Sequence, residues 1–186
     1  AEFTRGTKFQ NNSATANGGG LYAANGADVK FDAATFTGNS AKNGGAIYVN
    51  SGVLTLPASV VLRGNNATEN GGAVYAANGT DVKFDAVTFT GNSATGDGGA
   101  VKVDGGAKAE FTGGTKFQNN SAANGGAVHA ANGADVKFDA VTFDGNKATG
   151  NGGAVYLETG GKAAFANDVL FENNTATGGG ALYVFK

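Results

Sequence analysis

The chain has 186 residues, a net charge of −2, 33 glycines, one proline and no cysteine, methionine or tryptophan. The lack of cysteine excludes disulfides and thiolate metal sites, and the near-neutral charge leaves no basic face for nucleic acid or anionic lipid. Thirteen phenylalanines distinguish the chain from a disordered glycine-rich linker. We expect one folded domain over residues 1–186, with no bound nucleic acid, no cofactor and no direct membrane insertion.

The first expected element of each repeat follows the string Gly-Gly-Ala plus an aliphatic residue. Where the string begins at Gly71, Val74 and Ala76 would face one side of a short strand and Tyr75 the other. The variant GGGL begins at Gly18, and from Gly44 onward successive copies lie 27 residues apart. The copies begin at Gly44, Gly71, Gly98, Gly125, Gly152 and Gly179.

Two further strands are expected after each glycine motif. Residues 82–84 place Val82 and Phe84 on one face, with Lys83 opposite, and residues 87–89 repeat this alternation with Val87 and Phe89. Glycine, asparagine and aspartate separate the alternating segments, as is typical of turns. No segment has helical periodicity, so the pattern predicts three short strands in each repeat.

A second motif, Phe-x-x-Asn-x-Ala, ends each repeat. Its asparagine is predicted to hydrogen-bond across repeats and to satisfy the backbone of a buried turn. One copy of the motif has Leu62 in place of phenylalanine, and the same unusual repeat contains Leu56 and Pro57. Pro57 is expected just after a strand, because proline has no amide donor. The predicted asparagine ladder contains Asn12, Asn39, Asn65, Asn92, Asn120, Asn146 and Asn174.

Stacking of the repeats predicts the fold. Three strands cannot close a core alone, whereas stacked copies pair each strand with its counterparts above and below. We therefore predict an all-β, right-handed, single-stranded parallel β-helix of about seven coils of about 27 residues. Phe84, Phe111 and Phe138 should form one interior column, and Phe89, Phe117 and Phe143 another.

The paired motifs resemble those of the chlamydial polymorphic membrane proteins, whose signatures are FxxN and GGA[I/L/V]. The GGAI form is literal at residues 44–47, and the resemblance extends along the whole chain. It implies a passenger segment of an autotransporter: a secreted β-helix, displayed at the bacterial surface on the outer membrane, that mediates adhesion to host cells. The implied partner is a host-cell surface protein or glycan.

The outward face of the first strand is the candidate binding surface. It consists of Tyr22, Tyr48, Tyr75, Lys102, His129, Tyr156 and Tyr183. Stacked tyrosines either stabilise a sheet or form a contact strip for carbohydrate or protein. His129, the only histidine, is interpreted as a surface residue of this column. With no second histidine and no cysteine, we expect no catalytic triad and no metal site.

Three functions are compatible with this fold. The favoured one is a non-enzymatic adhesin or structural passenger with a repetitive binding face. An ice-binding or fibre-forming protein is the alternative, although the threonine column of the third strand is interrupted at Val61, Lys116 and Leu170. A polysaccharide-acting enzyme is the third possible function. Such an enzyme needs clustered aspartates, whereas the aspartates here, for example Asp85 and Asp139, recur with the repeat.

The chain starts and stops within coils, without an amphipathic cap. Because open β-helix ends are unpaired sheet edges, we expect either that the native protein continues beyond both termini or that copies associate end to end.

Overall fold

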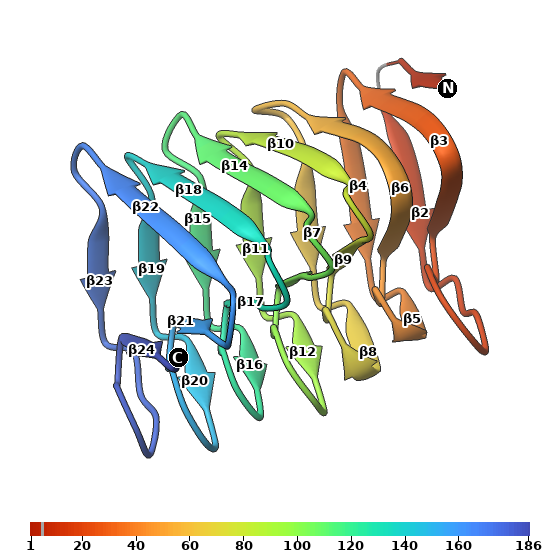
Figure 1. Cartoon of the computed structure of the whole chain (residues 1–186). Coiled ribbons are helices and arrows are strands. Elements are labelled where there is room, and N and C mark those ends of the chain that lie inside the picture. Colours follow the sequence, from red (N-terminus) through yellow and green to blue (C-terminus); the bar gives the residue numbers. More distant parts are fainter. Residues whose placement is uncertain (5) are drawn as a thin grey trace.

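The computed structural model describes residues 1–4 and 6–186. Its strands are stacked in parallel around one axis, so that coils follow one another from the red N-terminal end to the blue C-terminal end (Figure 1). Corresponding strands of neighbouring coils pair in parallel, for example Phe84 with Phe111 and Phe89 with Phe117. The predicted parallel β-solenoid of about seven coils is confirmed.

The first and second strands of each coil belong to one twelve-stranded sheet, which we call the large sheet. In two early coils they merge into one long strand, β3 or β6. The large sheet consists of β1 (Glu2–Phe3), β3 (Leu21–Phe31), β6 (Ile47–Leu56), β9 (Val74–Ala77), β10 (Asp81–Asp85), β13 (Val101–Val103), β14 (Lys108–Thr112), β17 (Val128–Ala130), β18 (Asp135–Asp139), β21 (Val155–Leu157), β22 (Lys162–Ala166) and β24 (Leu182–Val184).

The predicted third strand of each coil forms a seven-stranded sheet, and the structure adds a short fourth strand at the asparagine corner, in a five-stranded sheet. The alternation in this segment is too short to be recognised as a strand. The seven-stranded sheet consists of β2 (Thr7–Gln10), β4 (Ala34–Thr37), β7 (Val61–Arg63), β11 (Thr88–Thr90), β15 (Lys116–Gln118), β19 (Thr142–Asp144) and β23 (Leu170–Glu172). The corner sheet consists of β5 (Ser40–Asn43), β8 (Asn66–Asn70), β12 (Ser93–Ala94), β16 (Ser121–Ala122) and β20 (Lys147–Ala148).

Phenylalanine columns fill the interior as predicted. Phe111 stacks on Phe84 at a ring-centroid distance of 4.7 Å and contacts Phe117 of the other column edge-to-face at 5.2 Å. Full burial of one such side chain stabilises the fold by roughly 2–3 kcal/mol. In the unusual coil, Leu56 and Leu62 are fully buried in the same columns, and Pro57 directly follows β6.

Asparagines connect the corners of all seven coils. The backbone amide and the side-chain Nδ2 of Asn65 both donate to Oδ1 of Asn92, at 3.0 and 2.9 Å. Nδ2 of Asn65 also donates to the carbonyl oxygen of Phe36 in the preceding coil. The same pattern links Asn12 through to Asn174. From Asn39 to Asn146, each carboxamide therefore satisfies a buried turn that an aliphatic side chain would leave unpaired.

Glycine at the second position of the GGA motif is required by close backbone stacking. A Cβ atom built on Gly72 would lie 2.0 Å from the carbonyl oxygen of Gly99 in the next coil. Because the backbone fixes the position of a Cβ atom and the carbonyl oxygen belongs to the backbone, no rotamer change can relieve this clash. The motif therefore determines the fold, and it positions the strand that follows it.

Candidate functional site

The outward residues of the first strand form one continuous column across the coils. Tyr22 pairs with Tyr48, Tyr48 with Tyr75, and Tyr75 with Lys102. The column then continues through His129 and Tyr156 to Tyr183. All seven candidate residues are therefore brought together, although their environments differ.

The N-terminal part of the column is an open aromatic surface. The Tyr22 side chain is 53% exposed, and its ring stacks on Tyr48 with a centroid distance of 5.5 Å and an interplanar angle of 4°. Tyr48 then contacts Tyr75 edge-to-face at 5.1 Å. Flat rings with accessible edges and hydroxyls can contact a sugar or a protein side chain.

The middle of the column is buried, so the interpretation of His129 as a surface residue is wrong. His129 is 0% exposed, Lys102 6% and Tyr156 8%. The side chains point away from the hydrophobic interior, but residues from the flanking turns cover them. Two of these covering residues, Asp97 and Glu158, are charged and contact His129 directly.

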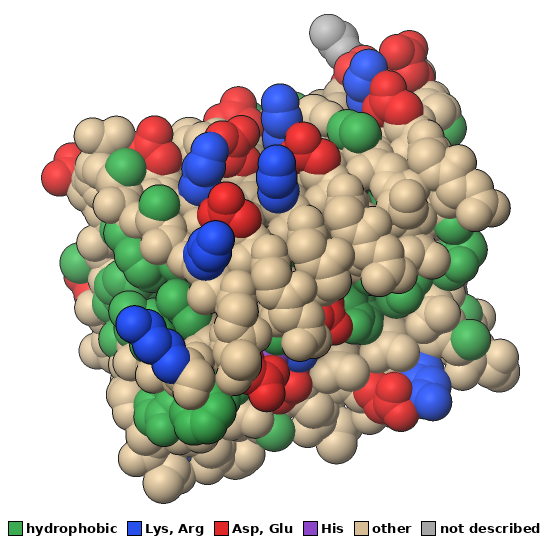
Figure 2. Space-filling model, viewed as in Figure 1, with side chains coloured by type: hydrophobic (Ala, Val, Ile, Leu, Met, Phe, Trp, Pro, Cys, Tyr) green, Lys and Arg blue, Asp and Glu red, His purple; other side chains and the backbone are tan. Residues whose placement is uncertain are grey.

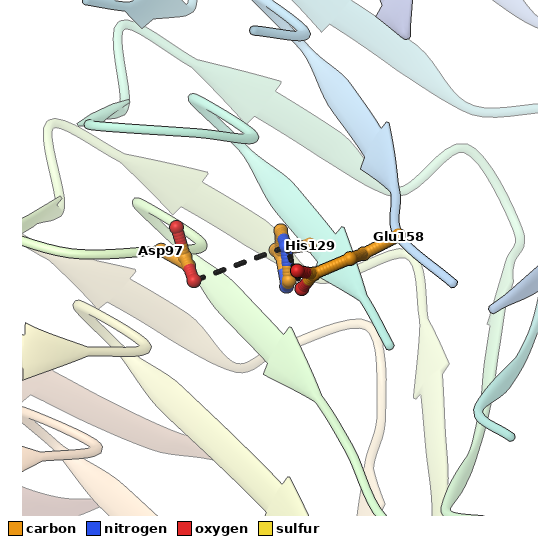
Figure 3. Close-up of side chains that lie close together, drawn as sticks. All are labelled: Asp97, His129 and Glu158. Atoms are coloured by element: carbon orange, nitrogen blue, oxygen red, sulfur yellow. Dashed lines mark ion pairs between the residues drawn. The ribbon is translucent and has the colours of Figure 1, made fainter. Parts of the chain in front are cut away.

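His129 lies between two carboxylates that come from different coils (Figure 3). Its Nε2 atom is 3.3 Å from Oε2 of Glu158 and 3.9 Å from Oδ2 of Asp97. Asp97 forms an isolated parallel bridge with Asn124 before β13, His129 is in the middle of β17, and Glu158 directly follows β21. Successive coils thus supply one side chain each.

Hydrogen bonds fix the carboxylates around this cluster. Lys102 Nζ and Asn124 Nδ2 donate to the two carboxylate oxygens of Asp97, at 3.1 Å each. Asp104 accepts hydrogen bonds from the Tyr75 hydroxyl at 2.9 Å and from Asn132 Nδ2 at 2.7 Å. These hydrogen bonds preorganise the carboxylates of Asp97 and Asp104.

Burial determines the protonation state of the histidine. Desolvation, reinforced by the Lys102 ammonium, lowers the pKa of His129 to about 4, although Asp97 and Asp104 act in the opposite direction. Burial alone would raise the pKa of Asp97, but the positive charges beside it and its hydrogen bonds outweigh that effect and lower it. At neutral pH the cluster therefore contains a neutral imidazole and an ionised Asp97.

Comparison with known proteins assigns the repeat. The family description "Chlamydia polymorphic membrane protein (Chlamydia_PMP) repeat" matches seven segments that together cover most of the chain. The matched residues are 6–24, 33–50, 59–77, 86–107, 114–131, 140–158 and 168–184. This chain belongs to the Chlamydia polymorphic membrane protein repeat family. No curated protein and no solved structure matches it.

The sequence alone did not identify the two acidic residues, Asp97 and Glu158, that contact His129 in this polymorphic membrane protein repeat domain. Asp97 occupies a position that is asparagine in five other coils: Asn17, Asn43, Asn70, Asn124 and Asn151. Glu158 occupies a position held by Ala77 and Ala131 in other coils. These departures from the repeat were the available signal, but only the fold shows that they converge on His129.

The second strands of the repeat domain present a separate, charged face. Lysine, aspartate and glutamate side chains are interspersed over β10, β14 and β18 (Figure 2). Lys137 Nζ lies 3.7 Å from Oε1 of Glu110 in the preceding coil, which agrees with cross-coil pairing of opposite charges. No helix of the described residues is long and apolar enough to cross a membrane.

Proposed function

We propose that this repeat domain is part of a non-enzymatic passenger at the bacterial surface, and that it binds a host-cell protein or glycan through the outward column. The supporting observation is the stack of the exposed Tyr22 ring on the half-buried Tyr48, on a scaffold whose parallel strands hold it flat. Membership of the polymorphic membrane protein repeat family supports the location, because that family is associated with the outer membrane or the cell surface.

The regular placement of the second-strand aspartates supports a binding role over an enzymatic one for that face. Asp85 and Asp139 recur at equivalent positions of β10 and β18, separated by β14. At a strand spacing of about 4.8 Å, these two carboxylates lie roughly 10 Å apart, so the repeated aspartates do not form the close pair, about 5–5.5 Å apart, that a retaining glycosidase needs. The threonine column is interrupted at Val61 and Lys116, which disfavours a flat ice-binding array.

Binding to host cells tests this proposal. Replacing Tyr22 and Tyr48 together by serine should reduce binding of the purified domain to cultured host cells by about tenfold, because aromatic anchors dominate contact surfaces. The matched control replaces Thr88 and Thr142, which lie on the seven-stranded sheet, by alanine. Equal binding by the tyrosine and threonine variants, with both folded by circular dichroism, would reject the aromatic column as the contact surface.

A further inference from the structure

Beyond the proposed adhesion, we propose that Asp97, His129 and Glu158 form a binding site for a divalent transition-metal ion of the zinc class. One ligand atom from each residue is available, and these atoms all lie within 4.8 Å of one another. The Nε2 atom of His129 faces both carboxylates (Figure 3). The ion would connect three successive coils.

The two distances from the imidazole nitrogen to the carboxylates are close to those of tetrahedral coordination. Metal–ligand bonds of about 2.0–2.1 Å in a tetrahedron place the ligand atoms roughly 3.3 Å apart. The Nε2–Glu158 distance is 3.3 Å, and the Nε2–Asp97 distance is 3.9 Å, so Asp97 would move toward the ion on binding. Three protein ligands leave the fourth coordination position of the ion free. Because the side chain of Glu158 is 45% exposed, a water molecule can reach that position.

His129 supplies an independent observation that points to a ligand. Both of its ring nitrogens are buried, and neither has a hydrogen-bond partner among the described residues. Buried polar atoms are nearly always paired, because an unpaired one loses its hydration without replacement. A metal ion at Nε2 would give this buried nitrogen a partner.

The surrounding charges favour a cation. Asp97, Glu158 and Asp104 are three carboxylates near the imidazole, and Lys102 is the ammonium group that faces them. The set carries an excess of two negative charges, which a divalent ion would neutralise. Lys102 Nζ lies 3.1 Å from the same oxygen of Asp97 that faces His129, so the ammonium competes directly with an ion.

The repeat itself shows that these residues are not needed for folding. Other coils have asparagine, tyrosine and alanine at the three positions, as in Asn124, Tyr156 and Ala131. D97N, H129Y and E158A therefore each restore a side chain that the solenoid already accommodates. These variants should fold, so a loss of binding can be assigned to the site.

Calorimetric titration of the tag-free chain with zinc chloride tests the site. We expect one zinc ion per chain, and D97N and H129Y should each weaken binding by more than about tenfold. D81N removes an exposed carboxylate of β10 and should bind zinc as the unmodified chain does. K102Q should bind zinc more tightly, because the competing ammonium is gone.

Two results would overturn the proposal. The first is the absence of zinc binding in both the unmodified chain and K102Q, which would make the cluster an ion-pair network only. The second is zinc binding that H129Y leaves unchanged. Because His129 is the only histidine, nitrogen NMR of its ring provides a direct readout: zinc should shift Nε2 much more than Nδ1. Neither result depends on adhesion to host cells.

Discussion

The interior columns and the outward column have the same strand register but different sequence rules. Phe117 stacks between Phe89 and Phe143 at 4.8 and 4.9 Å, and like residues repeat there because each ring must fill the same volume. In the outward column, Tyr75, Lys102 and His129 follow one another with the same pairing. Backbone pairing therefore sets the register on both faces, whereas only the interior restricts which side chain is used.

This difference indicates which positions of a repeat protein are free to acquire functional side chains. An interior position that departs from the repeat stays apolar and buried, as Leu56 and Leu62 do. An outward position can change without that restriction. Departures that cluster on the outside, such as Asp97 and His129, are therefore better evidence of a site than the repeated motifs.

The largest expected effect is in the interior. Phe117→Ala should lower the free energy of unfolding by about 3–5 kcal/mol, because it removes a fully buried ring and leaves a cavity. Phe165→Ala is the matched control in the last coil, where the ring is 39% exposed, and its loss should be clearly smaller. Urea unfolding followed by circular dichroism measures both; equal losses would mean that the columns do not contribute through burial.

A smaller loss is expected in the asparagine ladder. Asn92→Leu keeps a similar volume but leaves the buried amide of Asn65 without its acceptor, which costs about 1–3 kcal/mol. Asn12→Leu is the control, because Asn12 is exposed and its side chain only donates to Asn39. The same unfolding experiment compares them, and a loss at Asn12 as large as that at Asn92 would argue against a burial-dependent ladder.

Repetition made the fold predictable, but it concealed the cluster. The sequence repeats the 27-residue period, the strand alternation and the interior phenylalanine positions several times, so all three could be inferred. The position of Pro57 at a strand end followed from its missing amide hydrogen. The fourth strand was missed because Ser93–Ala94 is too short to alternate. The burial of His129 was missed because it depends on Asp97 and Glu158, which differ from the residues of most other coils and lie far from it in the sequence.

The smallest expected effect separates the two parts of the outward column. Tyr75→Phe removes a hydroxyl that donates to Asp104 in the next coil, so it should lower the free energy of unfolding by about 1 kcal/mol. Tyr22→Phe should change it by much less, because within the described residues the exposed Tyr22 hydroxyl has no such acceptor. Thermal and urea unfolding of the two variants provide the comparison. If Tyr22→Phe were the more costly change, the open part of the column would be a stabilising element, and its role as a free contact surface would lose its physical basis.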